Sequence, residues 1–523
     1  MKKQLINIIS AAIILGGVAG CSKNYLNINN NPNSATNTTP ELVLPQALTA
    51  TASTQVVAGF MPFIQCWMGY WAISGSYAAN NADPASYFQN TNFGDGTWQG
   101  YYHNLADYNY IEQTAITENK PFYEGAAKIM KAYVFQQLVD MFNNVPYSQA
   151  FQGTNIIQPK YDSAATIYAS LESQIDSAVV LMSSPSAQGA SATSDVLFGG
   201  NTTSWIQFAN TLQLRILMRQ SNAPGGPHNL TGELANINAN GAGYLTTDAG
   251  VNPGYANNAG QQSPVWGFFV TLTNQQTTGG SADYYRANQY AISWLQNNDD
   301  TVRLKFLYSP GGTGFLPNVT LANTLNGTYV SSDYIGNTLG QGNTGLGGNG
   351  ASSVGPGILQ SVGQNAYLMT TAEAYFLQAE AAYRGWSGFS NAGALCNNGV
   401  LASFTFLGDP NAAADAAAYT SQANVMTNYA ACTTPAQQLA CIIRQKWVAM
   451  DEVTPFESYC DYRRLGLPAD IATAALSVSP YIDNPPTIPT RILYPTSEYN
   501  TNTTNVDAQG TISGHTSLVF WNQ

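Results

Sequence analysis

The sequence predicts a mainly α-helical protein whose helices pair into a scaffold that is interrupted by a loop-rich insertion with short strands. The region between about residues 221 and 357 is rich in Gly, Asn, Thr and aromatic residues and shows little helical spacing of apolar residues. This composition indicates long loops and short strands. Outside that region, at about residues 40–220 and 358–470, apolar residues recur three and four positions apart, as on one face of a helix. Five segments show this spacing: 124–142, 161–182, 205–218, 372–384 and 435–450.

The N-terminus has the pattern of a bacterial lipoprotein signal. Lys2 and Lys3 precede an apolar run over residues 5–18, which is too short to cross a bilayer, since spanning takes roughly 20 residues. The run ends in Val-Ala-Gly followed by Cys21, a sequence that looks like a lipobox. We therefore expect residues 1–20 to be removed and Cys21 to carry the lipid anchor. The alternative is an ordinary secretory signal in which Cys21 has no role.

Residues 21–39 are expected to form a lipidated tether, and residues 40–523 a single domain. Asn, Ser, Thr and Pro dominate the tether and bury too little surface to fold. The first helix is expected to begin at Pro40, because Thr39-Pro40-Glu41 places a capping residue before a proline at the first helical position.

Composition excludes several classes of function. Only 9% of the 523 residues are charged, against about 25% in typical soluble domains. The net charge of -12 disfavours binding to nucleic acid, and no second apolar stretch is long enough for a transmembrane helix. The chain has three scattered histidines and no zinc-binding cysteine spacing, so we expect no catalytic residue, metal or cofactor.

Five cysteines remain once Cys21 is acylated. An odd number leaves at least one thiol free or bonded to another molecule. A disulfide between Cys396 and Cys432 would suit an oxidising envelope, and buried unpaired thiols are the equal alternative. The five are Cys66, Cys396, Cys432, Cys441 and Cys460.

Two glutamates on one predicted helix raise the question of a glycosidase. Glu373 and Glu380 are seven residues apart and so share a helix face, and glycosidases use two carboxylates across a sugar bond. The structural alternative is an ion pair, for example between Glu380 and Arg384. We favour the structural role for both glutamates. The same holds for a charge cluster expected to tie down the C-terminal helix, formed by Glu457, Asp461, Arg463 and Arg464.

Several segments in order along the chain resemble the SusD/RagB family of outer-membrane nutrient-binding lipoproteins. Each segment alone is modest, but their order behind a lipobox is specific, and the Asn-rich start is similar to one branch of the family. The segments are YLNINNNPN at 25–33, TPEL at 39–42, TWQGYY at 97–102, YNYI at 108–111, DMFNNVPY at 140–147, EAYFLQAEA at 373–381, QKWVAM at 445–450 and DYRRLGLP at 461–468.

The resemblance implies a fold of tetratricopeptide-like helix pairs forming a right-handed superhelical scaffold. It also implies a lipid-anchored outer-membrane protein at the cell surface, which passes a nutrient to a SusC-like TonB-dependent transporter. A glycan or oligosaccharide is the common ligand of such proteins, and some relatives serve peptide uptake. Surface-exported lipoproteins often carry acidic residues just after the lipidated cysteine, whereas the first acidic residue here is Glu41. The sequence therefore predicts attachment to the membrane more firmly than display on its outer leaflet. A surface glycoside hydrolase is the alternative from another class.

Aromatic residues in loops are the candidates for contacting a sugar. Sugar rings have flat apolar faces on which aromatic rings stack, and amides or carboxylates bind the hydroxyls. We expect the segment 67–93 to begin as a helix, with Trp67 and Trp71 on one face, and to become a loop after Gly75. Packing in the core is the alternative for each ring. The candidates are Trp71, Tyr77, Asn81, Asp83, Tyr87, Trp266 and Tyr284, and we expect a residue from each of the two segments to line one shared surface facing the transporter.

Overall fold

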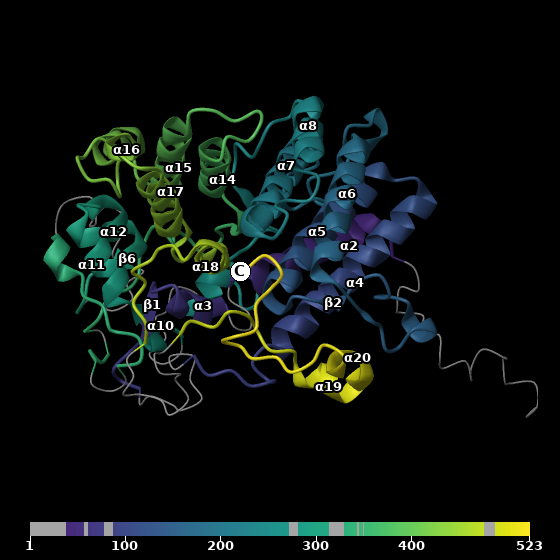
Figure 1. The fold of residues 1–523 in the computed structure, drawn as a ribbon, viewed down its shortest axis with the longest axis horizontal. Helices are drawn as coiled ribbons and strands as arrows, with labels where there is room; N and C mark the ends of the chain where they lie inside the picture. The colour runs from purple at the N-terminus through teal and green to yellow at the C-terminus, as the bar shows by residue number, and fades with distance from the viewer. Residues whose placement is uncertain are drawn as a thin grey trace, which may run out of the picture. The chain divides into compact units, whose positions relative to one another are not determined.

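The computed structural model describes residues 38–56, 61–77, 87–270, 281–312, 329–341, 345–348, 350–474 and 487–522. Cys21, Asn81 and Asp83, together with the signal and nearly all of the tether, lie outside these residues. Helices dominate the unit Pro40–Gln523 (Figure 1), and this confirms the predicted fold class. Within the described part of the chain, no helix combines the length and the hydropathy needed to cross a membrane.

Successive helices of the first half pack against one another in chain order, as helix pairs do in tetratricopeptide-like folds. Pro121 begins α5, and the side chains of Ser163 and Asn201 cap α6 and α7. In Figure 1 these helices lie side by side on the right. Their bounds are α2 Pro40–Val56, α4 Asp95–Glu118, α5 Pro121–Phe142, α6 Ala164–Met182 and α7 Thr202–Arg219.

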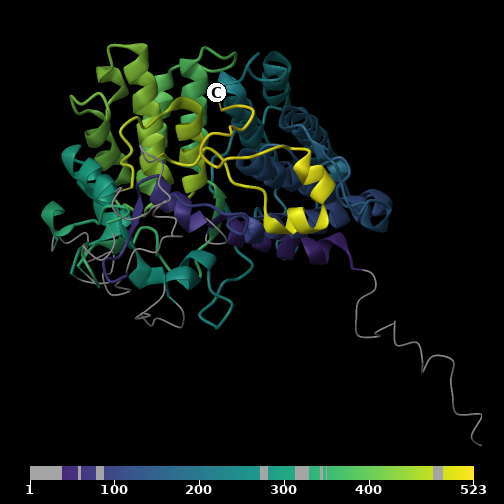
Figure 2. The same cartoon turned by 60° about the horizontal axis from the view of Figure 1, so that its bottom comes forward.

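The second half forms another helical group, coloured green in Figure 1. Thr434 and Gln437 form a capping box at the start of α17, and Thr370 caps α14. Helices α14 and α7 are in contact, so the two groups form one scaffold, and the turned view of Figure 2 again shows the green group beside the blue one. The bounds are α14 Thr371–Tyr383, α15 Ala392–Phe406, α16 Ala412–Thr420, α17 Pro435–Met450 and α18 Pro455–Leu465.

The predicted loop-rich insertion contains short strands, as expected, but also short helices that its composition did not reveal. These are α8 Leu230–Asn240, α9 Pro264–Phe269, α10 Ser281–Tyr284, α11 Gln289–Asn297 and α12 Thr301–Leu307. Four antiparallel strand pairs are described: β1 Trp71–Ile73 with β5 Tyr285–Ala287, β2 Val145–Pro146 with β3 Tyr161–Asp162, β4 Ala249–Val251 with β8 Ala366–Met369, and β6 Tyr308–Ser309 with β7 Ser353–Val354. The other α-helices in the described residues are α3 Met61–Trp67, α19 Thr496–Thr501 and α20 Thr503–Asp507.

One prediction about local structure is wrong. Helix α3 ends at Trp67, and Trp71 begins strand β1, so the two tryptophans do not share a helix face. The strand forms because β5, more than two hundred residues later, supplies its hydrogen-bonding partner. None of the five described cysteines forms a disulfide, which is the alternative to a bond between Cys396 and Cys432; the five are Cys66, Cys396, Cys432, Cys441 and Cys460.

A buried network of ion pairs joins five helices at the centre of the scaffold. Arg215 and Arg219 of α7, Lys446 of α17 and Arg464 of α18 are each within 4.0 Å of a carboxylate, and all of these side chains are at most 3% exposed. This network confirms the expected charge cluster for Glu457, Asp461 and Arg464, whereas Arg463 donates to the backbone carbonyls of Asp140 and Thr490. Its acidic members come from α5, α14 and α18 and are Asp140, Glu373, Glu380, Glu457 and Asp461.

Candidate ligand-binding site

Pairing of β1 with β5 brings the two aromatic segments of the sequence together. Trp71 lies opposite Ala287, and Ile73 lies opposite Tyr285. Tyr77 follows β1 and Tyr284 precedes β5, so both lie at the same end of the two-stranded sheet. Their rings meet edge to face, with centroids 5.0 Å apart and planes at 75°, and both side chains are half-buried. The structure therefore brings one residue of each segment together, while their lining of a ligand surface that faces a transporter stays a prediction.

Behind this pair the rings continue inward as an aromatic ladder. Tyr284 meets Tyr285 at 4.9 Å, and Tyr285 meets Trp71 at 5.1 Å between ring centroids. Phe268 stacks on both Tyr285 and Trp71, at 5.8 and 6.2 Å. Trp71 and Tyr285 are at most 9% exposed, whereas Phe268, Tyr77 and Tyr284 are half-buried. The aromatic ladder, defined as these five residues, thus has inner rings in the core and outer rings at the surface.

A carboxyl group fixes the innermost ring. The indole N–H of Trp71 donates a 2.7 Å hydrogen bond to Oε1 of Glu452, which lies in the turn between α17 and α18. Glu452 has a φ of 61°, a left-handed conformation that is rare for residues other than glycine. Burial, reinforced by neighbouring Asp451, raises the pKa of Glu452. Burial also raises the pKa of Asp451 to about 8, and Asp451 accepts a hydrogen bond from the hydroxyl of Tyr308.

Besides Trp71, two more of the predicted ligand residues lie in the core. Tyr87 has no exposed surface, and its hydroxyl oxygen accepts the Ala474 N–H at 2.9 Å. Trp266 of α9 is 6% exposed and belongs to the main apolar cluster. Neither ring offers a face to a ligand in this structure, so neither is kept in the candidate site. No local signal pointed to Glu452, because its contact with Trp71 spans 381 positions.

The glutamates that raised the glycosidase alternative are both held by arginines. Arg215 donates to the two carboxylate oxygens of Glu373 at 2.7 and 2.9 Å. Arg464 does the same to Glu380 at 2.6 and 2.7 Å, and Arg384 adds a bond of 2.8 Å, as expected from its spacing. Both glutamates are at most 1% exposed, so a substrate cannot reach them. Among the described residues, no group of three His, Cys, Asp or Glu side chains is placed to hold a metal ion.

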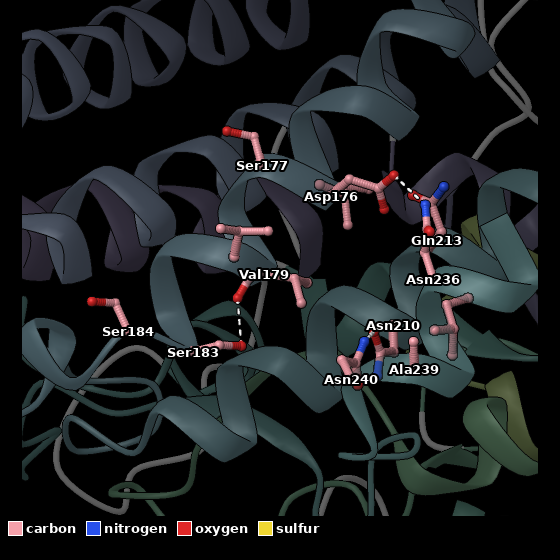
Figure 3. A pocket seen from close by; sticks show the side chains of 13 residues that line it. Asp176, Ser177, Val179, Ser183, Ser184, Asn210, Gln213, Asn236, Ala239 and Asn240 are labelled. Carbon is pink, nitrogen blue, oxygen red and sulfur yellow. Dashed lines mark hydrogen bonds between the residues drawn. The ribbon is translucent and has the colours of Figure 1, made fainter. Parts of the chain in front are cut away.

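A cavity of about 610 Å³ lies elsewhere, between α6, α7 and α8 (Figure 3). Its wall combines aliphatic residues, such as Ile175 and Val179, with Asn, Ser, Gln and Asp side chains, and none of its described lining residues is aromatic. Asn236 donates to Asp176 at 2.6 Å across its polar edge. Figure 1 shows α6, α7 and α8 at the upper right of the view and β1 and α10 at the lower left. This cavity is therefore separate from the aromatic ladder and offers no ring on which a sugar can stack.

Comparison with known proteins identifies the fold and the family. Residues 32–495 match the family model for SusD-like proteins, described as starch-binding and associating with the outer membrane. A SusD homologue from Bacteroides fragilis is 21% identical and superposes with a TM-score of 0.70 over 93% of this chain and 100% of its own. A chitin-binding SusD homologue from Flavobacterium johnsoniae is 20% identical, with a TM-score of 0.66 over 92% and 98% of the two chains. The comparison with curated proteins gives no match.

Proposed function

The chain belongs to the SusD-like family, and we propose that it is a lipid-anchored nutrient-binding protein that binds a glycan at the aromatic ladder and passes it to a SusC-like TonB-dependent transporter. Family membership supports a binding protein of the outer membrane rather than an enzyme, and the ion-paired glutamates agree with that. Cys21 is the proposed site of the lipid.

The observation that carries the proposed site is the half-buried pair of Tyr77 and Tyr284 on top of buried rings. An edge-to-face pair presents two ring surfaces at an angle, which suits a chain of sugar rings that bends. The inner rings are packed and Trp71 is hydrogen-bonded to Glu452, so the platform is ordered before a ligand arrives. Preorganisation of this kind lowers the entropy lost on binding.

Isothermal titration with maltoheptaose and with chitohexaose tests the site. Tyr77→Ala and Tyr284→Ala should each weaken binding by about 1–3 kcal/mol, or roughly 5- to 150-fold in Kd, because each removes one large apolar surface. Both variants should keep the thermal stability of the wild type. Tyr110→Ala is the matched control, because Tyr110 is 37% exposed on α4, outside the ladder. Unchanged Kd in both ladder variants, with a lower melting temperature, would overturn the proposed site.

The proposed transporter partner has its own test. A gene for a SusC-like transporter is expected beside the gene for this protein, and the two purified proteins should form a complex that survives gel filtration. Neighbouring glycosidase genes would support a glycan ligand, whereas neighbouring peptidase genes would favour peptide uptake. Absence of any complex with the encoded transporter would count against delivery.

A further inference from the structure

A second groove, of about 540 Å³, lies between strand β8 and helices α14 and α15. One face of α15 lines it with residues at helical spacing, including Asn398, Thr405 and Phe406. Tyr375 of α14 and Tyr367 of β8 form other parts of the wall. The groove shares no lining residue with the aromatic ladder or with the cavity between α6 and α8.

Aromatic rings and hydrogen-bonding groups converge in this groove. Tyr367 and Phe406 meet edge to face with centroids 4.9 Å apart and planes at 67°, an arrangement close to that of Tyr77 and Tyr284. Both rings are half-buried, as is Tyr375, so their remaining surfaces face the groove. The cavity between α6 and α8 has no such pair among its described lining residues.

The polar groups are placed around these rings. Asp248 lines the groove, and its Oδ1 accepts the Thr371 N–H at 2.7 Å, which fixes the carboxyl at the start of α14. Burial raises the pKa of Asp248. Asn398 and Thr405 are exposed, and the hydroxyl of Thr405 donates to the carbonyl of Leu401 at 2.9 Å, so its oxygen can still accept a hydrogen bond. Carboxyl, amide and hydroxyl groups beside aromatic faces match the two surfaces of a sugar ring.

The groove also approaches the back of the ladder. A narrow cavity of about 20 Å³ shares Tyr367 and Phe406 with it and is lined at another point by Glu452, the residue that holds Trp71. That volume is too small for a sugar ring, so the two sites are neighbours that a ligand reaches separately.

We propose that this groove is a second carbohydrate-binding site, in which a neutral oligosaccharide stacks on Tyr367 and Phe406 and bonds to Asp248, Asn398 and Thr405. The ligand class rests on the proposed function of the protein. One long polysaccharide that engages both sites binds the second with a high effective concentration, so its retention exceeds that of either site alone.

The test fills the groove without removing core contacts. Asn398→Trp places a large ring in the groove, and Asn397→Trp is the matched control, because Asn397 is the preceding residue on α15, is also exposed and does not line the groove. Both substitutions are made in the wild type and in a Tyr77→Ala/Tyr284→Ala background. Binding to amylopectin and to soluble glycol chitin is measured by affinity gel electrophoresis, and thermal melting checks the fold.

We expect Asn398→Trp to weaken retention by about 100-fold or more in the wild type, as loss of one of two linked sites would, and to abolish the retention that remains in the double-alanine background. Asn397→Trp should change neither. Retention that is insensitive to Asn398→Trp, or that is already absent in the double-alanine background, overturns the second site while the ladder stands. Retention that is insensitive to the ladder variants but lost with Asn398→Trp supports the groove and overturns the ladder. A wild type that binds neither polysaccharide overturns both.

Discussion

Replacing Glu380 by Gln tests whether the buried carboxylates are structural. Glu380 is 1% exposed and accepts bonds from Arg464 and Arg384. Burial alone would favour its neutral form, but the two arginines outweigh it and hold the pKa of Glu380 below its ordinary value. The stability it contributes is therefore present above the pKa of the unfolded chain, about 4.3, and is lost as pH falls through the lower folded value.

The size of the effect follows from what the Glu380→Gln substitution would leave behind. Breaking a buried ion pair costs about 3–5 kcal/mol. A glutamine side chain keeps the volume and one acceptor oxygen, and Arg464 keeps its bonds to Asp461 and Ser221, each at 2.8 Å, so we expect a value near the lower end, about 3 kcal/mol. An unfolding entropy of about 2.1 cal/mol/K per residue, over roughly 480 residues, converts this to a fall in Tm of about 3 °C.

Urea unfolding at neutral pH and thermal melting measure the change, with Glu118→Gln as the control. Glu118 pairs with Lys120 at 2.7 Å, but both side chains are at least 30% exposed, and exposed pairs contribute about 0–1 kcal/mol. Glycan affinity should be the same in all three proteins. A Glu380→Gln variant of unchanged stability that loses a glycan-cleaving activity would refute the structural role and restore the hydrolase alternative.

Three further predictions concern the anchor, the core and pH. Cys21→Ala should move the protein from the membrane to the soluble fraction; retention in membranes that lack the transporter would contradict a lipid anchor. Tyr87→Ala should lower the free energy of unfolding by about 3–5 kcal/mol, as for other buried aromatic residues, with unchanged glycan Kd, because the ring is fully buried. Asp451 has a pKa raised to about 8, so the folded state holds a proton that the unfolded chain releases near pH 4, and stability should fall as pH rises through that window. Asp451→Asn should flatten this dependence, and an unchanged slope would show that Asp451 is ionised in the folded protein.

Capping residues and apolar spacing within each segment were sufficient to predict the helices of the scaffold. The segment 435–450 matches α17 Pro435–Met450 because Thr434, Pro435 and Gln437 specify its start by themselves. The ion pair of Arg384 with Glu380 was also predictable, since four residues separate them on one helix.

Features that depend on distant partners were not predictable. The spacing of Trp71 from Trp67 predicts a shared helix face, whereas pairing with β5 makes the segment of Trp71 a strand. Tyr87 follows a segment rich in loop residues, yet its left-handed backbone, with a φ of 59°, and the Ala474 N–H fix it in the core. The contact between Tyr77 and Tyr284 was expected only as a shared surface; its edge-to-face geometry needed the sheet register. Their roles in binding stay predictions.

Glu452 connects the proposed site to the helical scaffold. Glu452 lies two residues after α17 and three before α18, the helix that supplies Glu457, Asp461 and Arg464 to the buried ion network. Its bond to Trp71 therefore connects the aromatic ladder to the part of the scaffold in which most charges are buried and paired. Tyr77 and Tyr284 lie next to the short strands β1 and β5, so this bond adds a contact with the scaffold to those that the two-stranded sheet supplies.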